Sequence, residues 1–177
     1  MNRTEITTIL QQNHTLFIDF IASLEEDALQ KAIPGKWNAA EQMEHVYLCL
    51  RPIVLAFRLP NFVPKLLFGK ANRESKSYEA LVQAYQNKLQ QGGKAPAVYI
   101  PKTSATLHAT QKRIRQVHSL VNSLTHQIDK HSEADLDQMI LPHPLLGKLT
   151  LREMACFAAY HVAHHHKQAA EIARLSV

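Results

Sequence analysis

Apolar residues recur every three or four positions along most of this chain, which is the spacing of amphipathic helices. No segment alternates apolar and polar residues between turn pairs, as the strands of a hairpin would. The sequence therefore predicts an all-α fold. The expected helices cover residues 2–31, 38–59, 77–90 and 103–131 and a final stretch from Thr150, with a brief turn or helix at 132–139.

Local signals mark where these helices begin and where they are interrupted. Residues 60–102, between the second and third long helices, hold four prolines and three glycines. Such a long crossover lets the second and third helices take positions that a tight hairpin would forbid. Residues 141–149 are expected to form a linker before the last helix. Two helices begin with the spacing of a capping box, Asn38 with Glu41 and Thr150 with Glu153.

The composition suits one domain over residues 1–177, because 46% of the 177 residues are hydrophobic and 20% are charged. Cys49 and Cys156 lie in apolar helical segments without a short metal or redox motif, so we expect both to be small buried hydrophobes. The most apolar run, residues 46–59, is interrupted by charge and proline and is shorter than the roughly 20 residues that span a bilayer. With no signal-peptide pattern at the start, we expect a cytoplasmic protein without a membrane partner.

The chain carries a net charge of +5, and its basic residues gather loosely near Lys65 and Lys70 and at residues 112–115. A solvated helix face explains the second group, and no motif that reads nucleic acid accompanies either group. We therefore expect no nucleic-acid partner. The positive charge of these residues could instead attract an anionic small substrate or a thiol cofactor. The apolar face of residues 46–57 would suit a homodimer, although a monomer would bury that face internally.

The final helix carries the densest group of histidines, His161-Val162-Ala163-His164-His165-His166. His161 and His165 lie one turn apart on its apolar stripe, so their imidazoles can converge on one metal ion. His164 falls on one flank of the stripe, and His166 lies further round, toward solvent or a neighbouring helix. Neutral imidazoles in a core need partners for their nitrogens, and a divalent cation provides one. The stripe comprises Leu151, Met154, Ala158, His161, His165, Gln168, Ile172 and Leu175.

A third ligand has to come from another helix. His45 lies on the second turn of the most apolar helix, where it could face the final one, although a lone core histidine is the commoner case. His143 stands between two prolines that hold it extended, so we expect a loop residue that could pass near the site. The other histidines lack ligand-like spacing and are expected at the surface or its boundary: His14, His108, His118, His126 and His131.

Two segments of the chain resemble the DinB-like superfamily. Trp37, followed by His45 and a proline-containing apolar stretch, is similar to the second helix of that superfamily. Residues 143–150, followed by the pattern H-x-x-H-H-x-x-Q at 161–168, are similar to its final linker and helix. The resemblance implies a four-helix bundle of up-up-down-down topology with a divalent metal at one end. The ligands that it implies are His45, His161 and His165.

The run of histidines leaves a choice of register, because His164 could replace His165 if the helix were rotated. His165 is preferred, since it lies nearest the centre of the stripe. Three neutral imidazoles leave at least one metal position open, as in catalytic rather than closed structural zinc sites. Water or a thiol bound there would become a nucleophile at neutral pH, and zinc or nickel suits imidazole donors.

The resemblance covers several activities, including thiol-dependent transferases and isomerases and proteins described as metal-dependent hydrolases. We therefore expect a metal-dependent enzyme that activates a thiol or water for S-transfer or hydrolysis on a small molecule, with a low-molecular-weight thiol as a candidate cofactor. The alternative is a non-catalytic bundle whose histidines bind metal for stability or merely pack. Gln168 could bond a ligand or cap the bundle end, Glu44 could be a base or a solvated carboxylate, and Trp37 could contact substrate or anchor the bundle. No residue stands out as a dedicated acid or base.

Overall fold

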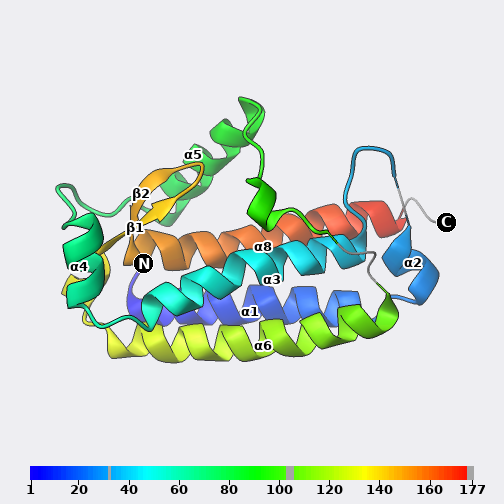
Figure 1. Ribbon diagram of the computed structural model, residues 1–177, viewed down its shortest axis with the longest axis horizontal. Coiled ribbons are helices and arrows are strands. Elements are labelled where there is room, and N and C mark those ends of the chain that lie inside the picture. The colour runs from blue at the N-terminus through cyan, green and yellow to red at the C-terminus, as the bar shows by residue number, and fades with distance from the viewer. Residues whose placement is uncertain (32, 103–105, 175–177) are drawn as a thin grey trace.

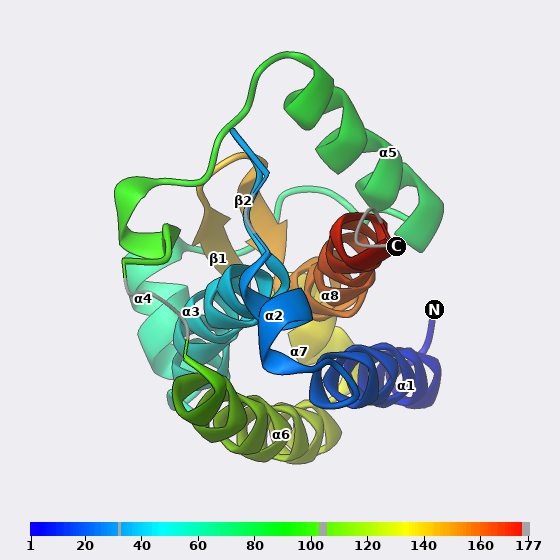
Figure 2. The same ribbon diagram turned by 90° about the vertical axis from the view of Figure 1, so that its right-hand side faces the viewer.

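The computed structural model describes residues 1–31, 33–102 and 106–174. Its four long helices lie side by side as a bundle (Figure 1, Figure 2): α1 (Arg3–Ala22), α3 (Ala39–Phe57), α6 (Leu107–Lys130) and α8 (Leu151–Arg174). Both α1 and α3 pack against α6 and α8, so α1 and α3 lie diagonally opposite each other. The chain therefore forms the helical bundle that its apolar periodicity indicates.

Contacts near the helix ends give the direction of each helix. Arg3, at the start of α1, donates to backbone carbonyls at the end of α6. Arg152, at the start of α8, donates to the carbonyl of Met1. Glu44 and Arg113, near the starts of α3 and α6, form an ion pair. Hence α1 and α8 run one way and α3 and α6 run the other, which is an up-down-down-up order (Figure 1).

The expected up-up-down-down order is wrong at the first connection. The described part of residues 23–38 holds the brief helix α2 (Glu26–Gln30), and this segment stays at one end of the bundle. Because α1 ends and α3 begins at the same end of the bundle, α3 runs antiparallel to α1. The helix predicted over residues 2–31 is accordingly split into α1 and α2.

The predicted long crossover between the second and third long helices is confirmed. After α3 the chain forms α4 (Phe62–Phe68), α5 (Tyr78–Gln90) and a short 3-10 helix, η1 (Ala97–Tyr99), before α6 begins. This segment passes from one end of the bundle to the other, which makes α3 and α6 parallel (Figure 1). The predicted helix start at Thr103 lies outside the described residues; Thr106 caps α6 by accepting the N–H of Ala109.

The chain is mostly helical, as predicted, and departs from helix between the short helix α7 (Glu133–Gln138) and α8. There β1 (Ile140–His143) and β2 (Gly147–Thr150) pair antiparallel along their whole length, where the sequence predicts a linker. Each strand has only four residues, too few for alternation to be recognised. Pro144 favours extended backbone at the residue before it, and Gly147 adopts a φ of +74° that suits glycine.

Both predicted capping boxes are present. The side chain of Asn38 accepts the N–H of Glu41 at 2.8 Å, and the Glu41 carboxylate accepts the N–H of Asn38 at 2.9 Å. Thr150 and Glu153 make the same exchange at the start of α8, at 3.1 and 2.9 Å. These caps fix the first turns of α3 and α8, and the helix α3 then continues through Pro52.

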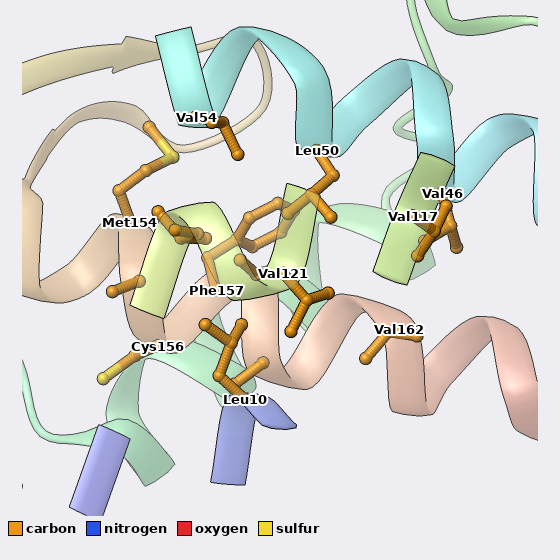
Figure 3. Packing of buried hydrophobic residues seen from close by; sticks show 14 of the residues in the cluster. Leu10, Val46, Leu50, Val54, Val117, Val121, Met154, Cys156, Phe157 and Val162 are labelled. Atoms are coloured by element: carbon orange, nitrogen blue, oxygen red, sulfur yellow. The ribbon is translucent and has the colours of Figure 1, made fainter. Parts of the chain in front are cut away.

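Apolar side chains of all four long helices meet in the core, and Figure 3 shows part of it. Burying one side chain of this size is worth about 1.5–3 kcal/mol. The core therefore fixes the register at which α3 faces α8, and that register decides which polar side chains meet. The labelled residues include Leu10 of α1, Val46, Leu50 and Val54 of α3, Val117 and Val121 of α6, and Phe157 and Val162 of α8.

None of the described helices is both long enough and apolar enough to cross a membrane by itself. The helices α3 and α4 reach the required length and composition only as a pair, with a bend of 108° between them. Much of α3 is buried inside the bundle, which accounts for its apolar composition.

Candidate metal centre

Three histidines from two helices meet between α3 and α8. His45 lies on the second turn of α3, and His161 and His165 lie one turn apart on α8. The Nε2 atom of His161 is 3.4 Å from Nε2 of His45 and 3.0 Å from Nε2 of His165. The three residues are only 3%, 6% and 4% exposed. The structure thus brings together the three residues that the resemblance implies as ligands.

Hydrogen bonds to the chain fix the proton position in two of these rings. Nδ1 of His45 donates to the backbone carbonyl of Tyr99 at 2.7 Å, and Nδ1 of His165 donates to the side-chain oxygen of Gln42. A neutral imidazole has one N–H, so Nε2 of His45 and Nε2 of His165 both carry a lone pair. His161 can donate a proton to only one of them. Among the three histidines, one Nε2 lone pair is therefore left without a proton, and the thiol of Cys49, whose Sγ lies 3.5 Å from Nε2 of His45, is placed to donate to it in the metal-free protein.

Burial keeps these rings neutral. Desolvation lowers the pKa of His45 although the bond to Tyr99 acts against it. Desolvation, followed by repulsion from the neighbouring histidines, holds the pKa values of His161 and His165 well below their usual range. Protonation therefore does not satisfy the cluster at neutral pH. A cation at the point where the Nε2 atoms converge would do so.

The spacing of the donor atoms fits such an ion. Imidazole nitrogens bind zinc at about 2.0–2.1 Å, so two nitrogens of a tetrahedral site lie roughly 3.3 Å apart. The two Nε2 separations, 3.4 and 3.0 Å, lie close to that value. His45, Cys49 and His161 also form a group whose donor atoms all lie within 4.8 Å of one another. This group could hold a metal ion, and His165 adjoins it through His161.

The sulfur atom beside the histidines belongs to Cys49, one turn after His45 on α3. Its Sγ lies 3.5 Å from Nε2 of His45. In the metal-free protein, burial raises the pKa of this thiol to about 12. The prediction of a buried hydrophobe is confirmed for Cys156 in the core but is wrong for Cys49, which is half-buried and lines a cavity.

A cavity of about 920 Å³ opens beside the histidines, a volume in the range of small-molecule sites. Most of its wall is apolar, and it includes residues of α3, α8 and the crossover. Trp37 forms part of this wall, with its ring centroid 4.7 Å from that of His45 and 6.3 Å from that of His165. The charged residues of the described lining are Lys36, Lys94 and Glu171.

The other residues considered for the site have different surroundings. His164 lies in the cavity wall, where its Nε2 is 3.0 Å from the amide nitrogen of Gln168. Gln168 therefore contacts His164 rather than His165. Glu44 is paired with Arg113 and does not line the cavity, so it is not placed to act as a base there.

The register of α8 also decides the roles of the remaining residues on that helix. His166 faces the opposite way, with its ring 5.0 Å from that of Phe20 on α1. His165, rather than His164, is therefore the residue beside His161 and His45. The last position of the predicted stripe, Leu175, lies outside the described residues.

Two further histidines are more deeply placed than the sequence suggests. His143 belongs to β1, lines the cavity and packs with its ring 4.3 Å from that of Phe157. His14 is 2% exposed, and its Nδ1 donates to the carbonyl of Leu10 at 2.8 Å. Burial lowers the pKa of each ring to about 4.

The expectation of a surface or boundary position is wrong for His14. It is also wrong for His131, which is buried at 7% exposure. It is confirmed for the three exposed histidines His108, His118 and His126.

Sequence reasoning missed the two groups that orient the histidine rings. Gln42 lies three residues before His45, on the same side of α3, and its amide nitrogen donates to the carbonyl of Trp37 at 3.3 Å. This second bond determines which end of the amide faces His165. A polar residue on the buried face of an apolar helix was the available signal. No signal of that kind marks Tyr99, because its contribution is a backbone carbonyl brought in by the crossover.

Fold and site together define a helical-bundle protein with a buried histidine-rich group that could hold a metal ion. A comparison with known families matches residues 9–169 to the DinB superfamily, and the chain belongs to that superfamily. The resemblance carried by Trp37, His45 and the final helix is thereby confirmed. No curated protein and no solved structure matched the chain.

Proposed function

We propose that this protein is a metal-dependent enzyme in which His45, His161 and His165 hold one divalent ion. The ion, zinc or nickel, would activate a thiol or water for S-transfer or hydrolysis on a small molecule. One observation carries the proposal: Nε2 atoms with fixed lone pairs converge at ligand spacing beside a large cavity. A divalent cation there would lower the pKa of a thiol or water molecule, so that either could attack an electrophile at neutral pH.

The residues around the histidines prepare the site for that role. The carbonyl of Tyr99 and the amide of Gln42 hold two rings with Nε2 free, so little reorganisation is needed. Trp37 packs beside the rings of His45 and His165 in the cavity wall, and the apolar wall limits access of water. A low dielectric strengthens the electrostatic interactions of whatever binds there.

The cavity indicates the kind of substrate. Its mainly apolar wall favours a molecule with an apolar body, and its volume of about 920 Å³ also leaves room for a low-molecular-weight thiol. The few charged residues, Lys36, Lys94 and Glu171, would contact polar ends of such a pair. We propose a cytoplasmic location, where small thiols are kept reduced.

Metal analysis and an activity screen test this proposal together. The purified protein is stripped with a chelator, reloaded with zinc or nickel, and assayed with small thiols plus electrophiles and with ester and amide substrates. We expect one bound ion per chain and an activity that disappears with the chelator and returns with the metal. His166→Ala is the control, because His166 faces α1. Failure of the stripped protein to rebind either metal would overturn the proposal.

The second candidate is a non-catalytic metal site, and the proximity of Cys49 favours it. Four protein ligands without an open position are typical of structural zinc sites, whose loss usually unfolds the protein. Thermal unfolding of the stripped protein separates the two functions. A strongly unfolded metal-free protein would support the structural role, whereas a folded one with modest metal-dependent stabilisation would support the enzyme.

A further inference from the structure

Two pairs of candidate donors face each other across the α3–α8 interface, and each pair has a spacing of four residues. His45 and Cys49 form the pair on α3, and His161 and His165 form the pair on α8. We infer that Cys49 is the fourth ligand in the resting protein and binds the ion through Sγ. This inference rests on the metal centre of the proposed function and extends its ligand set to three imidazoles and one thiolate.

The interatomic distances support a place for sulfur in the same coordination shell. Zinc binds thiolate sulfur at about 2.3 Å and imidazole nitrogen at about 2.0–2.1 Å, so a tetrahedral site separates the two atoms by roughly 3.5 Å. Sγ of Cys49 lies 3.5 Å from Nε2 of His45, and one donor atom each from Cys49, His45 and His161 fall within 4.8 Å of one another. The sulfur therefore lies within reach of an ion bound by His45 and His161, and His165 adjoins this group through His161.

Charge gives a second reason for a thiolate. Three neutral imidazoles leave both positive charges of a divalent ion uncompensated in a mainly apolar setting, which is costly. A thiolate reduces the net charge of the centre from +2 to +1, and the thiol proton passes to solvent when the metal binds. No carboxylate belongs to the described lining of the small cavity on which Cys49 borders, where the neighbours are apolar apart from His14 and His161.

The position of Cys49 also connects this ligand to the proposed reaction. Cys49 is half-buried and contributes to the wall of the large cavity. A small molecule that takes the fourth position from the cavity would therefore have to displace Sγ. The three histidines, by contrast, are almost fully buried and would stay in place.

Cobalt spectroscopy tests the inference directly. Metal-free full-length protein is titrated with Co²⁺, because a cobalt–thiolate bond gives a strong near-ultraviolet charge-transfer band that imidazole ligands do not give. We expect this band in the wild type and in Cys156→Ser, and its loss in Cys49→Ala. Cys156 is the matched control, since it is the chain's second cysteine and lies in the core away from the cavity. We also expect Cys49→Ala to weaken zinc binding by at least roughly tenfold.

The possible outcomes separate this inference from the proposed function. Cobalt binding without the band in the wild type, or a band that persists in Cys49→Ala, overturns the thiolate ligand and leaves the histidine site standing. Absence of cobalt and zinc binding in the wild type overturns both. If Cys49→Ala does not fold, alkylation of the wild type decides: bound zinc should slow modification of Cys49 at least roughly tenfold. An unchanged rate with zinc bound would contradict ligation by Cys49.

Discussion

The helix α8 carries two buried polar centres that differ in how they are completed. At its start, Glu153 is 0% exposed and accepts hydrogen bonds from Arg73 at 2.6 and 2.8 Å and from the backbone N–H groups of Lys76 and Thr150. Two turns later, Nε2 of His161 lies 3.4 Å from Nε2 of His45 and 3.0 Å from Nε2 of His165. The first centre contains its own counter-charge, and the second does not.

This difference distinguishes a buried polar group with a structural role from one that is suited to bind a ligand. Burial alone would raise the pKa of Glu153, but the hydrogen bonds from Arg73, Lys76 and Thr150 outweigh it and hold the pKa below its usual value. That carboxylate is therefore charged and neutralised within the fold, which is a structural role. The histidines are neutral and hold unprotonated Nε2 atoms close together, an arrangement that suits an external cation.

The largest effect should come from removing a ligand of the incomplete centre. We expect His161→Ala to lower zinc affinity by more than about 100-fold, since even loss of an outer hydrogen-bond partner costs 10–100-fold. Competition with a coloured chelator measures this affinity. His165→Ala should behave alike, whereas His164→Ala should retain metal because His164 bonds with Gln168 instead. Equal affinity in all three variants would contradict the assignment of ligands.

The complete centre should respond in stability rather than in metal binding. We expect Glu153→Gln to lower the free energy of unfolding by about 1–3 kcal/mol, because the buried amide cannot accept all the hydrogen bonds that the carboxylate accepts. Urea unfolding measures this loss, and zinc affinity of the folded variant should stay within a few-fold of wild type. Glu133→Gln is the control: its side chain is 51% exposed, so loss of its pair with Arg152 should cost below about 1 kcal/mol. If Glu153→Gln is as stable as that control, Glu153 does not have the structural role that distinguishes it from the histidines.

As pH falls, the stability contributed by the buried His14 should be lost at a higher pH than the stability contributed by Glu153. The pKa of His14 is about 4 in the fold against 6.5 in the unfolded chain, so below pH 6.5 only the unfolded chain takes up the proton. The stability linked to His14 is therefore complete above pH 6.5 and is lost as pH falls toward 4, by about 3 kcal/mol. Glu153, with a lowered pKa, contributes a loss only below about pH 4.5.

Urea unfolding of the metal-free protein at several pH values checks this prediction. His14→Gln should flatten the decline between pH 6.5 and 4. The exposed His126 provides the matched control, and His126→Gln should keep the wild-type profile. Parallel profiles for wild type and His14→Gln would mean that His14 does not resist protonation in the fold.

Much of the site could be predicted because its ligands depend on local spacing. The pair His161 and His165 follows from helical period, whereas His45 was singled out as the third ligand by the resemblance to the DinB superfamily. The packed core then sets the register that brings these residues together. Whether they bind metal is still a prediction, which the affinities above test.

The features of the fold and the site that could not be predicted depend on contacts between residues far apart in the sequence. The carbonyl of Tyr99 reaches His45 only because of the path of residues 58–98, which helical periodicity does not encode. The direction of α3 depends on how the described part of residues 23–38 turns, and the strands β1 and β2 are too short to show a period. Cys49 was misread for a different reason: its place on an apolar helix suits a small hydrophobe as well as a ligand.

The smallest effect concerns the residue that orients a ligand without touching the ion. Gln42→Leu removes the acceptor for Nδ1–H of His165, so the ring loses its fixed lone pair at Nε2 and zinc affinity should fall about 10–100-fold. Gln42→Glu keeps an acceptor at that position and should restore binding to near the wild-type level, which a merely structural role would not explain. Gln168→Leu is the control, since Gln168 contacts His164, and it should change affinity by less than about threefold. If Gln42→Leu binds zinc as tightly as Gln168→Leu, then the orientation of His165 is set by packing against Trp37 and not by this hydrogen bond.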